Sequence, residues 1–139
     1  MVQLIVGNKG KGKTKHLLDK VNTEVKEAQG NIVYLDKSTK HMFELNNKIR
    51  LIDVSEYLVS SSDEFIGFIC GIISQDHDLQ QMYFDSFLKI ACVNESDIGA
   101  TIEKLETIST KFNVDFVLSI SVEESSLPED LKSKLIIAL

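Results

Sequence analysis

The chain has 139 residues, of which 43% are hydrophobic and 26% are charged, and its formal net charge is −6. This length and composition predict one globular domain that spans residues 1–139 and buries a hydrophobic core. The acidic balance argues against a nucleic-acid-binding surface, which would need an excess of Lys and Arg.

Strands and helices alternate in the first half of the chain. An apolar strand is predicted over residues 2–6, followed by a loop rich in Gly and Lys and then a helix. One face of that helix has a stripe of apolar residues, which are Leu17, Leu18, Val21 and Val25. Gly30 stands where the cap at the end of that helix would be. The β-branched and aromatic segment 31–36 predicts a second strand, 37–48 is polar and irregular, and 49–54 is a third strand.

The second half continues the alternation. Ser61 and Glu64 form a capping box for an apolar helix over about 63–75, whose Gly67 and Gly71 predict close packing on a sheet. A fourth strand over 79–84 ends at Asp85. A long amphipathic helix over about 97–112, a fifth strand over 114–122, a helix start at 126–129 and a last strand over 135–139 complete the prediction.

This order predicts an α/β fold with a mainly parallel sheet and helices on both faces, arranged as a three-layer sandwich. In such sheets ligands bind beyond the carboxyl ends of the strands. The loop after Val6 falls at that edge, and so do Asp36 and Asp85. We therefore expect these segments to meet at one site.

Residues 7–14 read Gly-Asn-Lys-Gly-Lys-Gly-Lys-Thr and fit the spacing G-x-x-x-x-G-K-[ST]. The three glycines allow successive backbone N–H groups to turn inward around a phosphate. Lys13 would reach the β- and γ-phosphates, the Thr14 hydroxyl would ligate Mg²⁺, and the helix that follows would direct its positive end at the same anion. The residues expected to contact the nucleotide are Gly7, Asn8, Lys9, Gly10, Lys11, Gly12, Lys13, Thr14 and Lys15.

The loop resembles the Walker A motif of the P-loop NTPases, and the chain is similar to small, functionally undefined bacterial P-loop ATP-binding proteins. The resemblance implies ATP and Mg²⁺ as ligands, with catalytic roles for Lys13 and an acid in the Walker B role. Asp85 is the preferred Mg²⁺-shell acid, and Asp36 is its rival. The N-K-x-D motif that reads guanine is missing, so ATP is preferred over GTP.

Hydrolysis of ATP by the chain alone is doubtful on this pattern. Many ATP hydrolases place Glu directly after the Walker B Asp, whereas Asp85 is followed by Ser86. Glu44, Glu95 and Asp97 are loop carboxylates that could reach the site, and nothing selects among them. Ser119 and Ser121 occupy the region where some P-loop ATPases keep a polar sensor of the γ-phosphate, and half-buried strand serines that face the polar side are an equally good interpretation.

Three functions remain open at this point. The first is a slow or partner-activated ATPase or nucleotide switch, with a second copy or another protein as partner. The second is a nucleotide-binding module that does not hydrolyse. The third is a small-molecule kinase, which the presence of only one arginine, Arg50, argues against. If the Asp85 strand lies beside the loop strand, the chain groups with kinases and GTPases, and if another strand intervenes it groups with motor-type ATPases.

Apolar runs, cysteines and histidines give further expectations about where the protein is found and which residues are exposed. No apolar run approaches the ~20 residues of a membrane span, and no signal peptide precedes the loop, so we expect a cytoplasmic protein without a membrane partner. Cys70 and Cys92 lack zinc-site or disulfide spacing and are expected to be buried or half-buried thiols. His16, His41 and His77 lack metal-ligand spacing and are expected at the surface or an interface.

Overall fold

A single parallel sheet organises the computed structural model, which describes residues 1–139. Its six strands are β1 (Val2–Val6), β2 (Asn31–Asp36), β3 (Ile49–Asp53), β4 (Leu79–Phe84), β5 (Asp115–Ile120) and β6 (Leu135–Ala138). They lie in the order β3-β2-β4-β5-β1-β6, and every pair is parallel. Parallel strands need crossover connections, which the intervening helices and loops supply.

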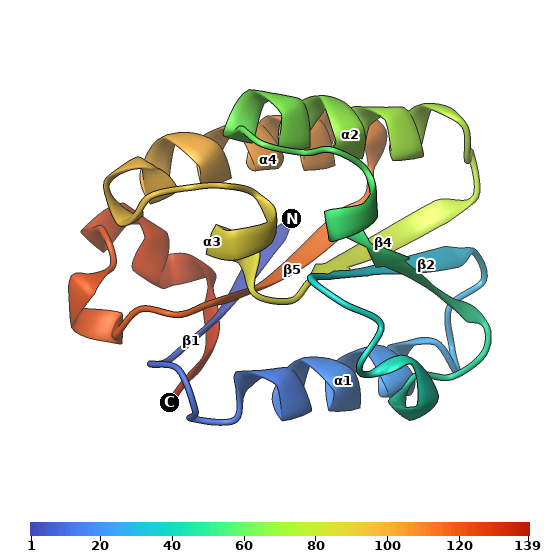
Figure 1. Ribbon diagram of the computed structural model, residues 1–139, viewed down its shortest axis with the longest axis horizontal. Coiled ribbons are helices and arrows are strands. Elements are labelled where there is room, and N and C mark those ends of the chain that lie inside the picture. The colour runs from blue at the N-terminus through green and yellow to red at the C-terminus, as the bar shows by residue number, and fades with distance from the viewer.

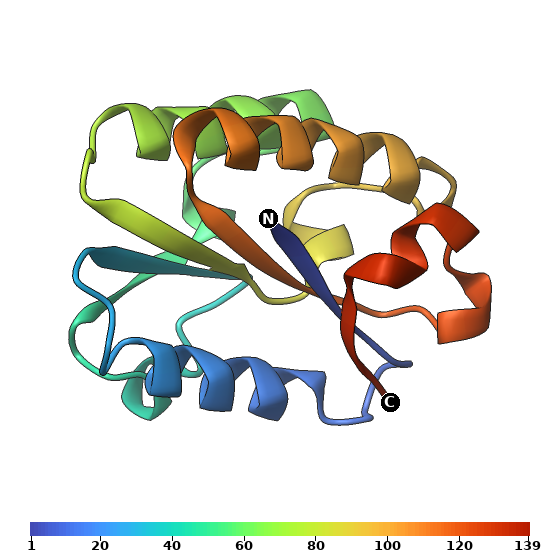
Figure 2. The same cartoon turned by 180° about the vertical axis from the view of Figure 1, so that it is seen from behind.

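Helices cover both faces of this sheet, as predicted (Figure 1). Helix α1 (Lys13–Glu24) lies alone on one face, and α2 (Ser62–Ser74) and α4 (Ile98–Phe112) lie side by side on the other (Figure 2). The larger core cluster, of 27 buried residues, lies on the α2 and α4 side, and a cluster of 10 lies under α1. The three-layer α/β sandwich expected from the sequence is confirmed.

Several local expectations need correction. Helix α1 ends at Glu24, before Gly30, which instead lies against the Asp78 carbonyl. Gly67 and Gly71 face open space on the outside of α2, because the helix packs on the sheet through Phe65, Ile69 and Ile73. The segment after Pro128 is a 3-10 helix (Glu129–Lys134), and the sequence analysis missed the one-turn helix α3 (Phe87–Ile90).

The strand register determines what meets at the carboxyl edge. Leu35 is level with Phe84, and Phe84 is level with Leu118. The next residues, Asp36, Asp85 and Ser119, therefore lie level with one another at the carboxyl ends of three adjacent strands. Strand β5 lies between β1 and β4, so the Asp85 strand is separated from the loop strand by one strand. This is the second of the two strand orders considered above, the one expected of motor-type ATPases.

The end of the chain lies beside the 7–14 loop (Figure 1). The Leu139 amide donates to the Val6 carbonyl at 2.9 Å, and a Cβ on Gly7 would approach Leu139 Cβ to 2.9 Å. Strand β6 thus covers one side of the strand that carries the loop. Gly7 has to lack a side chain because Leu139 fills that space.

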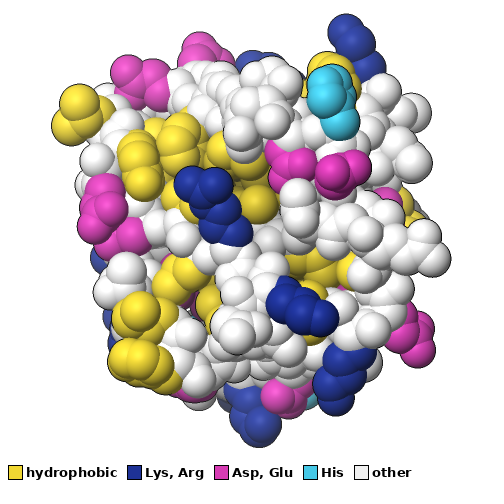
Figure 3. Space-filling view, turned by 90° about the vertical axis from the view of Figure 1, so that its right-hand side faces the viewer, with side chains coloured by type: hydrophobic (Ala, Val, Ile, Leu, Met, Phe, Trp, Pro, Cys, Tyr) yellow, Lys and Arg dark blue, Asp and Glu magenta, His cyan; other side chains and the backbone are white.

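The side of the molecule remote from the loop has a mixed surface. Figure 3 shows acidic, basic and hydrophobic side chains interspersed over that side. No helix of the structure is both long and apolar enough to cross a membrane.

Candidate nucleotide-phosphate site

The 7–14 loop leaves β1 and enters α1 in a conformation that two glycines make possible. Gly10 and Gly12 have φ values of 89° and 92°, in the left-handed region that other residues rarely adopt. Gly12 occupies the N-cap of α1, and no side chain caps that helix end. The first backbone N–H groups of α1 therefore lack a side-chain partner, which is the arrangement that binds phosphate.

Lys13 lies under this loop with 8% of its surface exposed. Its Nζ donates to the Asn8 carbonyl at 3.2 Å, so the ammonium group is held across the mouth of the loop. Burial lowers the pKa of Lys13 below its ordinary value, and the nearby Asp85 carboxylate opposes that shift. The group is placed to exchange its carbonyl partner for a phosphate oxygen.

Asp85 is the centre of a hydrogen-bond network at the end of β4. Its Oδ1 accepts from the Thr14 hydroxyl at 3.1 Å and from the Ser119 hydroxyl at 3.0 Å, and its Oδ2 accepts from the Tyr34 hydroxyl at 2.9 Å. The Ser86 amide donates in turn to Ser119 Oγ at 2.9 Å. Thr14 and Asp85, the two residues predicted to serve Mg²⁺, are thus in direct contact.

Tyr34 and Ser119 hold Asp85 from neighbouring strands. Burial and the adjacent Asp85 carboxylate raise the pKa of the Tyr34 phenol far above its ordinary value, so the phenol keeps its proton and remains a donor. Ser119, considered above as a phosphate sensor, contacts Asp85 and is 1% exposed. Its role in this geometry is to orient the carboxylate.

Asp36 lies beside Asp85 at the end of β2 and is 2% exposed. Its Oδ1 accepts from the Lys37 amide at 2.7 Å, while its Oδ2 has no hydrogen-bond partner. Burial and the charge of Asp85 raise the pKa of Asp36 above its ordinary value. Both acids that the sequence offered as the Mg²⁺-shell acid therefore lie at the site. Asp85 is the one that accepts a hydrogen bond from Thr14.

A cleft of about 530 Å³ opens above these residues, and Leu88 is the one hydrophobic residue that lines it. Lysines surround it from three segments of the chain: Lys9 and Lys13 from the loop, Lys37 and Lys40 after β2, and Lys89 from α3. A polar cleft with this many cations suits a polyphosphate, although the whole chain is acidic. Ser121 also lines the cleft.

Other residues named from the sequence lie outside this cleft. Lys15 Nζ pairs with Asp19 at 3.2 Å on the exposed side of α1, and the side-chain Nδ2 of Asn8 donates to Glu123 Oε1 at 2.8 Å. Lys11 is exposed and does not line the cleft. Glu95 and Asp97 lie in the short turn before α4 and do not line it either.

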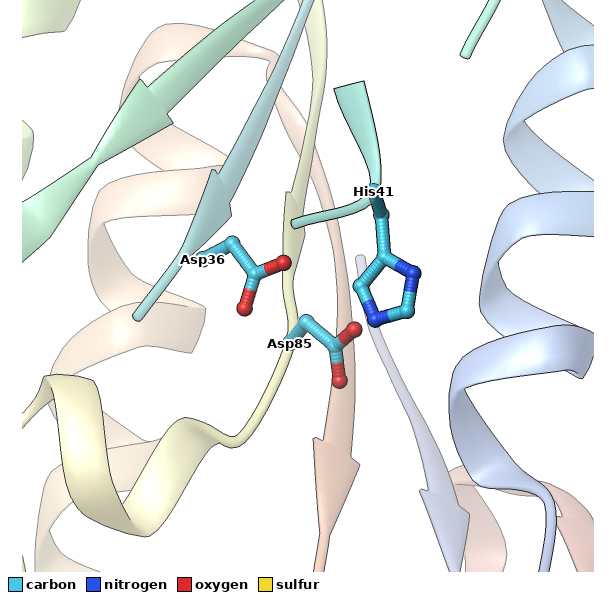
Figure 4. A group of neighbouring side chains, drawn as sticks. All are labelled: Asp36, His41 and Asp85. Atoms are coloured by element: carbon cyan, nitrogen blue, oxygen red, sulfur yellow. The ribbon is translucent and has the colours of Figure 1, made fainter. Parts of the chain in front are cut away.

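One of the sequence expectations about Cys and His is wrong. Cys92 is exposed rather than buried, although Cys70 is half-buried as expected. His41 is half-buried at the cleft and lies beside Asp36 and Asp85, with one ligand atom from each residue within 4.8 Å of the others (Figure 4). The sequence spacing gave no sign of this group because its members come from three separate segments.

Comparison with known proteins gives structural neighbours only: no family model and no curated protein sequence matches this chain. A KaiC-like protein from Pyrococcus horikoshii superposes with a TM-score of 0.59 at 17% identity, covering 85% of this chain. The flagellar accessory protein FlaH from Methanocaldococcus jannaschii superposes with a TM-score of 0.58 at 12% identity, covering 95%.

The fold is that of a P-loop NTPase. This P-loop chain spans 61% of the KaiC-like chain and 65% of the FlaH chain. At such identities the likeness establishes the shared architecture, and the function has to be argued from the site itself.

Proposed function

We propose that this P-loop protein binds ATP with Mg²⁺ and acts as a slow or partner-activated ATPase or nucleotide switch. The observation that carries the proposal is the Thr14–Asp85 hydrogen bond of 3.1 Å beneath an uncapped helix end. A hydroxyl and a carboxylate in contact offer two oxygen ligands to Mg²⁺, which prefers oxygen. Thr14 would bind the ion directly, and Asp85 would hold its hydration shell.

The phosphates would lie along the loop. Backbone N–H groups of residues 10–14 would cradle the β-phosphate, and Lys13 would contact the β- and γ-phosphates. Lys9, Lys37, Lys40 and Lys89 line the same cleft and would balance the remaining charge. Ser119 and Tyr34 would keep Asp85 aimed at the ion, because both donate to its carboxylate.

Slow turnover by the isolated chain follows from the residues around Asp85. The next residue is Ser86, so no glutamate stands beside Asp85 to orient an attacking water. The one arginine, Arg50, lies on the edge strand β3 and does not line the cleft. Arginine is the residue that best stabilises a transferring phosphoryl group, so we expect a second copy or another protein to supply what is missing.

A module that binds ATP without hydrolysing it is the second candidate, and the lack of a glutamate beside Asp85 favours it. A small-molecule kinase is a weaker candidate, because β5 intervenes between β1 and β4 and arginine is scarce. Transfer of labelled γ-phosphate to a metabolite would distinguish the kinase from the other two.

The deciding experiment is thermal melting with ATP, ADP or GTP, with and without Mg²⁺. A ligand at about 100 times its Kd stabilises the native state by about 2.7 kcal/mol, which raises Tm by several degrees. We expect a Mg²⁺-dependent shift that is larger with ATP than with GTP and is lost in Lys13→Ala. Lys26→Ala, an exposed lysine beyond the end of α1, is the matched control and should keep the full shift. The absence of a shift with every nucleotide would contradict the proposal.

A further inference from the structure

Asp36, His41 and Asp85 form a group of potential metal ligands beside the proposed nucleotide site (Figure 4). Asp36 ends β2, Asp85 follows β4, and His41 comes from the 37–48 loop. The two carboxylates and the imidazole point toward one another in Figure 4. One ligand atom from each residue lies within 4.8 Å of the other two.

The decisive member of this group is Asp36. The residue is buried, with 2% of its surface exposed, and its Oδ2 has no hydrogen-bond partner. A buried carboxylate oxygen without a partner has lost its hydration without replacement, and a neighbouring carboxylate adds repulsion. A cation between Asp36 and Asp85 would remove both unfavourable contributions.

His41 is oriented as a metal ligand should be. Its Nδ1 lies 3.1 Å from Glu44 Oε1, which fixes the tautomer with the proton on Nδ1. The other ring nitrogen, Nε2, is turned away from Glu44 and faces the two carboxylates in Figure 4. A carboxylate behind a histidine is the usual outer shell of a metal-bound imidazole.

We propose that Asp36, His41 and Asp85 bind a divalent first-row transition metal of the Mn²⁺ to Zn²⁺ class. Two carboxylate oxygens and one imidazole nitrogen form a mixed donor set that such ions prefer and that Mg²⁺ does not. Ligand atoms around a tetrahedral zinc lie about 3.4 Å apart, so atoms within 4.8 Å of one another would have to move closer to bind such an ion. His41 and Asp85 also line the cleft, through which an ion could reach them.

This site shares Asp85 with the Mg²⁺ position proposed for the nucleotide, and its other two ligands differ. Thr14 approaches Asp85 through Oδ1 from α1, whereas Asp36 and His41 approach from β2 and the loop that follows it. The inference does not depend on nucleotide binding, because the metal ligands are complete without it. Failure of one proposal therefore leaves the other standing.

The test is a titration of the nucleotide-free protein with Co²⁺, followed by visible absorption, in a Cys70→Ser, Cys92→Ser background that removes both thiols. We expect one Co²⁺ per chain with the intense bands of a low-coordinate site, displaced by Zn²⁺ and not by millimolar Mg²⁺. His41→Ala and Asp36→Asn should each weaken binding by at least about tenfold, and Glu44→Gln should weaken it by about tenfold.

His77→Ala is the matched control, because His77 is an exposed histidine between α2 and β4, remote from the site. It should bind Co²⁺ like the parent protein, and circular dichroism should show every variant folded. His41→Gln provides a second, more conservative variant with the same expected loss.

Two results would overturn the proposal. One is a parent protein that binds no Co²⁺, which would show that the three side chains do not form a metal site. The other is a His41→Ala protein with undiminished affinity, which would place the ion on other ligands.

Discussion

At the scale of single residues, the site is built around two acids with different surroundings. Asp85 accepts from three hydroxyl groups, on Thr14, Tyr34 and Ser119, whereas Asp36 accepts from one amide and leaves an oxygen without a partner. Hydrogen bonds to the charged form stabilise a carboxylate, and burial without them destabilises it. Asp85 is therefore prepared for a ligand that needs its charge, and Asp36 is held in an unfavourable state that a cation would relieve.

The coupling between these acids gives a first prediction. Asp85→Asn removes a neighbouring negative charge, so the pKa of Asp36 should fall toward its ordinary value, although burial will keep part of the upward shift. Carboxyl ¹³C chemical shifts followed against pH would measure this. Asp53→Asn is the control, because Asp53 is level with Asp36 on the neighbouring strand β3 and does not contribute to the shift. An unchanged Asp36 pKa in Asp85→Asn would contradict the coupling.

The raised pKa of Asp36 means that its ionised carboxylate lowers the free energy of unfolding at neutral pH. Its pKa is raised in the folded state, so between the ordinary value of 3.8 and the raised value the folded chain binds more proton than the unfolded chain. The free energy of unfolding should therefore fall as pH rises through that window and stay lower above it.

Asp36→Asn removes this penalty, and its amide can donate to Asp85. We expect the variant to be more stable than the parent by about 1 kcal/mol at neutral pH, with the difference shrinking as pH falls toward 3.8. Urea unfolding at a series of pH values in metal-free buffer measures both effects. A variant less stable than the parent at neutral pH would refute the assignment of Asp36 as a strained charge.

At the scale of elements, the pattern predicted the strands well and their connections less well. The strands at 2–6, 31–36 and 79–84 have the predicted bounds because each contains several apolar residues that the sheet buries. The capping box also predicted α2, since Ser61 Oγ accepts from the Glu64 amide at 3.1 Å. Local chemistry determines such features, so the sequence reveals them.

Features that depend on distant contacts escaped prediction. Gly30 was predicted to be a helix cap because glycine is common at the ends of helices. In the structure a side chain at Gly30 would collide with the carbonyl of Asp78, which lies 48 residues later in the sequence. His41 looked like a surface histidine, yet the strand order brings it to Asp36 and Asp85. The order of strands and helices placed the loop, Asp36 and Asp85 at one edge of the sheet, whereas the approach of His41 from the 37–48 loop was not predicted.

The close approach at Gly30 gives a third prediction. A Cβ at this position would lie 2.1 Å from the Asp78 carbonyl oxygen, and the Asn31 amide donates to the same carbonyl at 2.7 Å. Gly30→Ala must displace that connection between β2 and β4, which should cost about 1–3 kcal/mol in the free energy of unfolding.

Gly67→Ala is the matched control because Gly67 lies inside α2 with nothing within 4 Å of an added Cβ. Alanine is the better helix former, so this variant should be more stable by about 0.5–1 kcal/mol. Urea unfolding of both variants measures the contrast. Equal effects of the two substitutions would show that the Asp78 contact does not constrain Gly30.

At the scale of the whole molecule, the chain combines an acidic surface with a cleft lined by lysines. Lys9, Lys13, Lys37, Lys40 and Lys89 line the cleft, while the formal net charge of the chain is −6. Lysine binds phosphate as a point charge, whereas arginine binds it through a planar fork that suits the transition state. The cleft is therefore better equipped to hold a nucleotide than to accelerate its hydrolysis.

Because the cleft has lysines and lacks an arginine, the last prediction is that a second copy of the chain supplies a group needed for hydrolysis. If a second copy completes the site, ATP hydrolysis per chain should be slow in dilute solution and should increase with chain concentration. Adding Lys13→Ala protein, which we expect not to bind ATP, should then raise the turnover of a fixed amount of wild-type protein, because the variant can still contribute its surface. Phosphate release measured over a wide concentration range provides the test, with serum albumin as the control for crowding. Constant turnover per chain, with no effect of the added variant, would exclude self-activation and leave another protein as the activator or a site that only binds.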